Sequence, residues 1–331
     1  MSEFEFEYRC PAKINLELRV KKTRHPEWGN RHEIDTIYCG VELCDFVETH
    51  PRDEGTGLVL ALTPYHGRTL FPAPGSPEFE SNLVIRAARA LAEACHVSPD
   101  ARIDLTKRIP VAAGLGGGSS DAAGTLIALT HSWGEAGKFD APGAIAPSWD
   151  MLMSIAAKLG ADIPFFLGSI DESGLAHGTG YGEKVEYYYP ARPTLPLPAD
   201  PEWEKWAPKA VALAIYDDGL STADVYRRFD EIGANPGDRN DLQRAALDLH
   251  PRSADAITYG GPEYGGSTGV TDIFISGSGP TVVALCKHLS DAQEQARHWE
   301  CRHLADRTEA VVATTRMWPF PTKNPNFDRN Y

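Results

Sequence analysis

A run of glycines followed by two serines is the feature that most limits what this chain can fold into. Residues 114–118 read Gly-Leu-Gly-Gly-Gly, and Ser119 and Ser120 follow directly. The run lies between a predicted strand at 102–105 and a stretch of helix-forming composition that extends to about Trp133. Glycine allows positive φ angles and a close backbone approach to a bound group. Because the loop also places backbone N–H groups at the positive end of a helix, it predicts an anion site suited to phosphates.

Other interpretations of this run stay open at the level of sequence. It can be a flexible linker, or a helix start that a serine merely caps. It is not a Walker A motif, because no Gly-Lys-Ser/Thr follows, and its glycine spacing does not fit the dinucleotide fingerprint. Asp121, next along the chain, either belongs to the phosphate site or is a first-turn carboxylate that the helix dipole favours.

The hydrophobic pattern predicts an α+β chain in two parts. Alternation predicts strands at 4–8, 14–20 and 36–49, and helical spacing predicts helices at 82–95 and 148–159. A tyrosine- and proline-rich stretch, 187–208, separates the parts, so we predict one domain over 1–186 and another over 187–331. For the second part we expect strands at 210–215, 273–275, 281–286 and 310–315, helices at 222–232 and 239–249, and a helix opened by a capping box at Ser290–Gln293.

Charge and composition narrow the class of partner. The 331 residues hold 32 Lys+Arg against 46 Asp+Glu, a net charge of −14 with histidine neutral. This excess argues against binding to nucleic acid or to an anionic membrane. The segment 9–32 nevertheless carries seven basic and only two acidic residues, so a small anionic ligand can find a positive region. No apolar run reaches the ~20 residues of a membrane span, the start does not look like a signal peptide, and six scattered cysteines suggest a reducing compartment. We therefore expect a cytoplasmic protein.

Three motifs stand in the order found in one enzyme superfamily. They are Pro11-Ala12-Lys13-Ile14-Asn15, the glycine–serine run, and Ser276-Gly277-Ser278-Gly279-Pro280. Together they resemble the motifs of the galactokinase, homoserine kinase, mevalonate kinase and phosphomevalonate kinase (GHMP) superfamily. The stretches 160–167 and 240–242 are similar to the branch of it that phosphorylates a cytidine diphosphate-linked alcohol in isoprenoid precursor synthesis.

The resemblance implies both a fold and a reaction. The expected fold is a two-domain α+β GHMP-kinase-like fold. Its N-terminal domain would resemble domain 2 of ribosomal protein S5, with a left-handed β-α-β crossover, and its C-terminal domain would be ferredoxin-like. The expected reaction uses ATP and Mg²⁺ and a small-molecule acceptor, carried out by a monomer or a homodimer.

The resemblance also implies two catalytic residues. Asp162 would be the base that accepts the proton of the acceptor hydroxyl, and Lys13 the cation that keeps this carboxylate ionised. From the residues alone, Asp162 could instead be an ordinary turn aspartate beside glycine and proline, and Lys13 an exposed strand lysine.

Binding residues follow from the same resemblance. The implied ATP site consists of Asn82, Lys107, Pro110, Gly114, Leu115, Gly116, Gly117, Gly118, Ser119 and Ser120, with Ser120 also facing Mg²⁺. The implied acceptor site consists of Asn15, Arg31, His32, Thr222, Tyr226, Ser278 and Gly279. Lys107 could equally be a solvated cation, and Ser278-Gly279 a tight turn between strands.

The cytosine contacts carry the clearest departure from the family pattern. His32 would hydrogen-bond the edge of the base, and Tyr226 would stack on its face. Arg31 stands where the family usually has a tyrosine. A guanidinium can also stack on a ring or pair with a diphosphate. Two further functions therefore stay open: another GHMP-type kinase, for homoserine or a mevalonate derivative, and a catalytically silent ATP-binding sensor.

Overall fold

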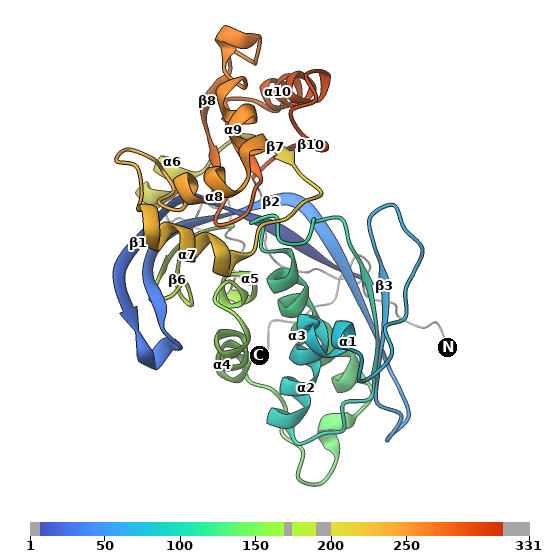
Figure 1. Ribbon diagram of the computed structural model, residues 1–331. Helices are drawn as coiled ribbons and strands as arrows, with labels where there is room; N and C mark the ends of the chain where they lie inside the picture. Colours follow the sequence, from blue (N-terminus) through green and yellow to red (C-terminus); the bar gives the residue numbers. More distant parts are fainter. Residues whose placement is uncertain (1–6, 169–173, 190–199, 314–331) are drawn as a thin grey trace.

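The computed structural model describes residues 7–168, 174–189 and 200–313, which form two β-sheets with helices packed against them (Figure 1). The first sheet contains β1 (Glu7–His25), β2 (Arg31–Pro51), β3 (Leu58–Thr63), β4 (Ala101–Thr106), β5 (Leu175–Thr179) and β6 (Lys184–Tyr188). The second contains β7 (Ala210–Ile215), β8 (Val270–Ile275), β9 (Val282–Cys286) and β10 (Arg307–Val311). The α+β, two-sheet architecture that the sequence predicted is confirmed.

The first sheet is covered by helices on one face. Its order is β3-β4-β2-β5-β6, and β1 pairs antiparallel with β2. The parallel strands β3 and β4 are joined through α1 (Pro77–Ser81) and α2 (Leu83–Cys95), which makes a β-α-β unit. α2, α3 (Gly117–Glu135), α4 (Trp149–Leu159) and α5 (Ile163–Leu167) bury their apolar sides against the sheet in one core.

The second sheet has the connectivity of a ferredoxin-like domain. Its antiparallel order is β10-β7-β9-β8. Between β7 and β8 lie α7 (Thr222–Ile232), α8 (Gln243–Leu249) and α9 (Pro251–Thr258), and α10 (Leu289–Cys301) joins β9 to β10. This split β-α-β arrangement is the one expected. Among the described residues, the remaining short helices are α6 (Pro201–Trp206) and the 3₁₀ turns Pro26–Trp28, Lys138–Asp140 and Pro262–Tyr264.

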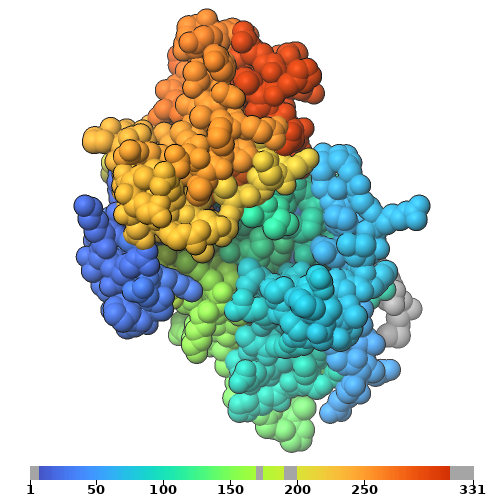
Figure 2. All heavy atoms as spheres, in the orientation of Figure 1, coloured from blue at the N-terminus to red at the C-terminus, as the bar shows by residue number. Residues whose placement is uncertain are grey.

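The alternation along β1 places its two faces in different environments. Ile14 and Leu16 lie in the core shared with the second sheet. Lys13 and Asn15, one residue out of phase, therefore point to the helix-covered face. Both are buried, at 4% and 3% exposure, so the side of β1 that looks polar in sequence is not a solvent face. In the space-filling view the C-terminal part sits on one end of the N-terminal part (Figure 2).

Several predicted elements have different limits in the structure. The predicted helix at 239–249 begins only at Gln243, because residues before it run beside β1: the N–H of Leu18 donates to the carbonyl of Arg239, and the N–H of Asp241 to the carbonyl of Leu18, both at 2.9 Å. The hydrophobic pattern of the sequence does not show that this segment pairs with β1. α9 was not predicted at all.

The capping box predicted at Ser290 is wrong, because α10 begins one residue earlier, at Leu289. The carboxylate of Asp291 accepts the N–H of His288 at 2.9 Å, so capping is centred on that residue. The last strand runs from Arg307 to Val311, and the predicted positions 314–315, like residues 4–6 of the first strand, lie outside the described residues. The domain boundary after residue 186 stays a proposal, and β6 continues to Tyr188. Within the ranges that the structure describes, no helix is both long and apolar enough to span a bilayer.

Candidate active site

Two glycine-containing loops, one from each part of the chain, meet at the centre of the site. Gly114, between β4 and α3, has a φ of +77°. A Cβ on it would lie 2.2 Å from the carbonyl oxygen of Ser276 and 2.7 Å from the nitrogen of Gly279. The hydroxyl of Ser276 donates to the carbonyl of Gly114 at 3.1 Å. Glycine is required there for both conformation and space, so the run at 114–118 is a packed loop and not a flexible linker.

Lys13 lies directly behind this loop. Its backbone N–H donates to the carbonyl of Leu115 at 2.9 Å. Its ammonium donates to Oδ1 of Asn15 at 2.6 Å and to the carbonyl of Gly114 at 3.2 Å. The side chain is 6% exposed, which rules out the solvated strand lysine. The buried charge is balanced by oxygen atoms on several sides, as a buried ammonium requires.

Asp162 faces Lys13 across the site. Its Oδ2 is 3.6 Å from the Lys13 ammonium, and the side chain is 30% exposed. Asp162 precedes α5 at the position of a helix cap, yet its side chain caps no N–H of that helix. Its Oδ1 instead accepts a hydrogen bond from the hydroxyl of Tyr38 at 3.0 Å. The carboxylate is therefore held by β1 and β2 and keeps access to a ligand, unlike an ordinary turn aspartate.

Lys107 has a different environment from the one expected of an ATP contact. Its ammonium bonds to the carboxylates of Asp45 and Asp121, the latter at 2.6 Å, and Asp45 also accepts the N–H of Ile109 at 2.7 Å. Burial opposes the charge on Lys107, yet Asp121 and Asp45 raise its pKa. Burial raises the pKa of Asp121 to about 8, against the attraction of Lys107. In this structure the cluster of Lys107, Asp45 and Asp121 holds the glycine loop in place. Lys107 is therefore not a solvated cation, and its role toward ATP stays a prediction.

The remaining predicted ATP residues lie in the segment before α3, in its first turn and at the start of α2. Gly116 has a φ of +69°, and a Cβ there would come within 3.0 Å of the Lys13 side chain. Leu115 is in the core, so only its backbone can face a ligand. Asn82 caps α2, because its Oδ1 accepts the N–H of Val84 at 3.0 Å. Half-buried positions close to the helix start are Pro110 and Ser119, and Gly117 and Gly118 form the first turn.

The predicted acceptor residues fall into two groups. The first adjoins Lys13: the amide of Asn15 donates to the hydroxyl of Thr36 at 2.7 Å, and the hydroxyls of Thr222 and Ser278 lie 2.9 Å apart. Gly279 packs so closely on the glycine loop that a Cβ there would be 2.0 Å from the nitrogen of Gly114. These residues form one wall of the site, so the 276–279 segment is more than a tight turn.

The second group lies where the β1–β2 hairpin meets α7. The ring of His32 stacks on that of Tyr226, with centroids 5.6 Å apart. Its Nδ1 faces the carbonyl of Lys21 at 2.8 Å, and its Nε2 lies 3.0 Å from the carboxylate of Asp230. Both ring nitrogens thus have protein neighbours, and an edge contact to cytosine would displace one of them. The exposed Arg31 covers the ring of Tyr181 at 4.7 Å.

The sequence reasoning missed Tyr38, Asp45 and Tyr181. Tyr38 and Thr36 repeat with period two on β2, as Lys13 and Asn15 do on β1, which is the signal that could have placed all four on one face. Lys13 bonds to Asn15 on its own strand, but Gly114 and Asp162 come from distant parts of the chain, so the pattern alone does not pair them with the lysine.

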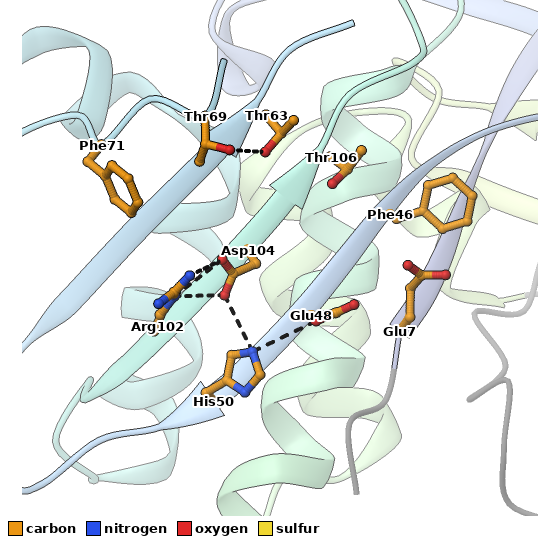
Figure 3. A pocket seen from close by; sticks show the side chains of 10 residues that line it. All are labelled: Glu7, Phe46, Glu48, His50, Thr63, Thr69, Phe71, Arg102, Asp104 and Thr106. Atoms are coloured by element: carbon orange, nitrogen blue, oxygen red, sulfur yellow. Dashed lines mark hydrogen bonds and ion pairs between the residues drawn. The ribbon is translucent and has the colours of Figure 1, made fainter. Parts of the chain in front are cut away.

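A cavity of about 670 Å³ lies elsewhere, on the sheet face that the helices do not cover (Figure 3). It is lined by Glu7, Phe46, Glu48, His50, Thr63, Thr69, Phe71, Arg102, Asp104 and Thr106. Arg102 pairs with Asp104 at 2.7 Å, and His50 lies 3.4 Å from the same carboxylate. With its basic groups already paired and carboxylates in the lining, this cavity is unsuited to a polyphosphate. The glycine loop stays the predicted phosphate site.

Comparison with known proteins agrees with this geometry. The model of the GHMP kinases N terminal domain matches residues 82–169, and that of the GHMP kinases C terminal domain matches 227–306. The chain belongs to the GHMP kinase family. Within that family it is similar to 4-diphosphocytidyl-2-C-methyl-D-erythritol kinases. It is 40% identical to that of Bifidobacterium longum strain NCC 2705, over 90% of this chain and 86% of the relative. It is 36% identical to that of Salinispora tropica, over 87% and 85%.

Solved structures give the same assignment of fold. A crystal structure of 4-(cytidine 5'-diphospho)-2C-methyl-D-erythritol kinase superposes with a TM-score of 0.64 at 26% identity, covering 93% of this chain and 99% of the other. A homoserine kinase from Cytophaga hutchinsonii superposes with a TM-score of 0.63 at 13% identity, covering 96% and 97%. The second likeness is one of fold alone.

Proposed function

We propose that this chain is an ATP-dependent kinase that phosphorylates the 2-hydroxyl of 4-diphosphocytidyl-2-C-methyl-D-erythritol, a step in isoprenoid precursor synthesis by the methylerythritol phosphate pathway. The observation that carries the proposal is the pair formed by Lys13 and Asp162, 3.6 Å apart beside the glycine loop. Relatives named for this reaction that align over most of the chain support the choice of acceptor.

The pair supplies what phosphoryl transfer to an alcohol requires. The acceptor oxygen attacks the γ-phosphorus of ATP. The bond between that phosphorus and the oxygen that bridges it to the β-phosphate breaks, and ADP leaves. The hydroxyl proton passes to Asp162, whose partial exposure lets it touch the acceptor. Lys13, beside the loop, reduces the repulsion between the reacting anions.

The loop and the helix behind it provide the phosphate cradle. α3 is 19 residues long and starts at Gly117, so its free N–H groups face the loop. Mg²⁺ would neutralise phosphate charge when bound with ATP. Among the described residues there is no cluster of three His, Cys, Asp or Glu side chains able to hold a metal by itself. The buried hydroxyl of Ser120 has no hydrogen-bond partner there, and one such oxygen beside phosphate oxygens is a ligand set that Mg²⁺ accepts.

The hairpin group would select the acceptor. Tyr226 offers an aromatic face, and Arg31 a guanidinium that can stack or pair with a diphosphate. Arg31→Ala and Tyr226→Ala should therefore raise the KM for the diphosphocytidyl alcohol while the KM for ATP stays within about twofold. The oligomeric state and the cytoplasmic location stay predictions.

The test is an assay of ADP release against a panel of alcohols that includes homoserine and mevalonate. Turnover with the diphosphocytidyl alcohol alone supports the proposal, and turnover only with another alcohol would assign the chain to another kinase activity. Asp162→Asn should lower kcat by at least about 100-fold with ATP still bound. If ATP binds but no alcohol is phosphorylated by the wild type, the chain is the silent ATP-binding protein instead.

A further inference from the structure

We propose that Tyr38 is a positioning residue for the phosphoryl transfer: its hydroxyl holds the carboxylate of Asp162 so that the other oxygen faces Lys13 and the acceptor. This inference rests on the proposed function, because it assumes that Asp162 is the base. Nothing in the sequence motifs assigns Tyr38, which lies in the middle of β2 outside all three of them. The observation behind it is the hydrogen bond of 3.0 Å from Tyr38 to Oδ1 of Asp162.

The two oxygens of Asp162 have different partners. Oδ1 accepts from Tyr38, and Oδ2 lies 3.6 Å from the Lys13 ammonium. Two partners on two strands fix both the position and the rotation of the carboxylate, whereas Lys13 alone would leave it free to turn. Fixed orientation matters because a base must meet the hydroxyl proton within hydrogen-bond reach.

The Tyr38 side chain is itself buried and tightly packed. It is 1% exposed, and its ring stacks on Phe165 of α5 with centroids 4.9 Å apart and an angle of 26°. A Cβ on Gly178 would lie 2.4 Å from the ring, and one on Gly182 would lie 2.6 Å from the hydroxyl. Two glycines thus leave the space that the ring and its hydroxyl occupy. The carbonyl of Gly182 is a second acceptor at 3.4 Å, and the carboxylate of Asp162, at 3.0 Å and charged, is the nearer and stronger one.

The hydroxyl acts only as a donor. Burial, and then the neighbouring charge of Asp162, raise the pKa of Tyr38 well above its ordinary value. The phenol therefore stays protonated around neutral pH, and its proton is available to the carboxylate. Tyr38 is not positioned to take the substrate proton, which is why we assign it a positioning role.

The decisive measurement is the steady-state kinetics of Tyr38→Phe. We expect kcat to fall about tenfold, the range for a lost hydrogen bond to a charged group, with the Kd of a nontransferable ATP analogue within twofold of wild type. Replacing Tyr38 by 4-aminophenylalanine keeps an N–H donor at that point and should restore most of kcat, while 4-methylphenylalanine, of similar size without a donor, should not. This pair also serves if Tyr38→Phe fails to fold.

Controls separate positioning from stability and from the identity of the base. Tyr216, directly after β7, is equally buried, and its hydroxyl donates to the carbonyls of Leu304 at 3.0 Å and Arg252 at 3.4 Å, neither of which belongs to the proposed site. Tyr216→Phe should lower Tm and leave kcat within twofold. In an Asp162→Asn background, Tyr38→Phe should cost less than twofold further, because the two residues act together.

Each outcome decides one question. An unchanged kcat in Tyr38→Phe, or equal losses with and without Asp162, would overturn the positioning role while Asp162 remains the base. If Asp162→Asn itself keeps wild-type turnover, the proposed mechanism is wrong instead, and Tyr38 has no base to position.

Discussion

Replacing Lys13 by methionine is the sharpest test of the catalytic pair. Methionine keeps most of the side-chain length that packs near Gly116 and removes only the charge and the donors. Negative charge that develops on an acceptor oxygen beside Asp162 would meet the ammonium at about the 3.6 Å of the Lys13–Asp162 pair, so at an effective dielectric constant of about 20 the attraction in the transition state is ~5 kcal/mol. Asp162 is 30% exposed, and solvent screening reduces this to roughly half.

Losing roughly 2 to 3 kcal/mol of this attraction corresponds to a rate about 100-fold lower, since each ~1.4 kcal/mol is a factor of ten. We expect this loss in kcat. The affinity for ATP should change little, because the loop N–H groups remain. The assay is coupled ADP release with the diphosphocytidyl alcohol, together with calorimetric binding of a nontransferable ATP analogue.

Lys138 provides the matched control. Its ammonium donates to the carbonyl of Ser98 at 3.0 Å and lies 3.7 Å from Asp100, outside the site. Lys138→Met should lower Tm and leave kcat within about twofold. A loss in Lys13→Met that is confined to the KM for ATP would refute the role given to Lys13, because it would make the lysine a nucleotide contact only.

Three other predictions concern the loop and its anchors. Gly114→Ala adds a Cβ 2.2 Å from the backbone of Ser276 at a φ of +77°. We therefore expect the free energy of unfolding to fall by more than ~2 kcal/mol in denaturant titration and the affinity for ATP to fall strongly in calorimetry. Wild-type values in both measurements would contradict the contact. The buried Asp121 has its pKa raised to about 8 in the folded state, so it binds a proton that the unfolded chain releases near pH 4, and stability should fall as pH rises from about 4 to 8. Asp121→Asn should flatten this part of the curve of Tm against pH. An unchanged slope would mean that the Asp121 carboxyl is not the group whose protonation changes the stability. Asn240 donates to the carbonyls of Ile275 and Gly277 at 2.9 and 2.7 Å, so Asn240→Ala should cost about 2 to 4 kcal/mol and raise the KM of the acceptor, whereas a stability change without any kinetic effect would limit it to a structural role.

Much of the site could be predicted because the glycine loop is local. Its glycines, the helix that follows and the strand before it lie within about 35 residues of one another, and residues 114–120 adopt a loop and helix start as expected. Lys13 and Asp162 were singled out from motif resemblance, and the structure brings them to 3.6 Å. The period-two pattern of β1 also predicted correctly which of its residues share a face.

The rest depended on which strand lies beside which. The hydrophobic pattern predicted a helix over 239–249, but residues 239–241 hydrogen-bond to β1 instead. A backbone segment beside an open strand edge can satisfy its N–H and C=O groups by pairing with that strand. Lys107 stays a predicted nucleotide contact, and the fold gives its ammonium two further partners, Asp45 on β2 and Asp121 on α3. No spacing in the sequence shows these partners.

The sequence by itself determined an α+β chain in two parts and predicted the kind of chemistry, with a phosphate-binding loop, a lysine and an aspartate. Only the tertiary structure decided how that chemistry is held, since Tyr38 from β2, Lys13 from β1 and the carboxylate before α5 meet through strand pairing and helix packing. The physical reason is range. Backbone conformation and helix ends are set by near neighbours along the chain, whereas the partner of a buried charge is set by whichever distant segment packs against it.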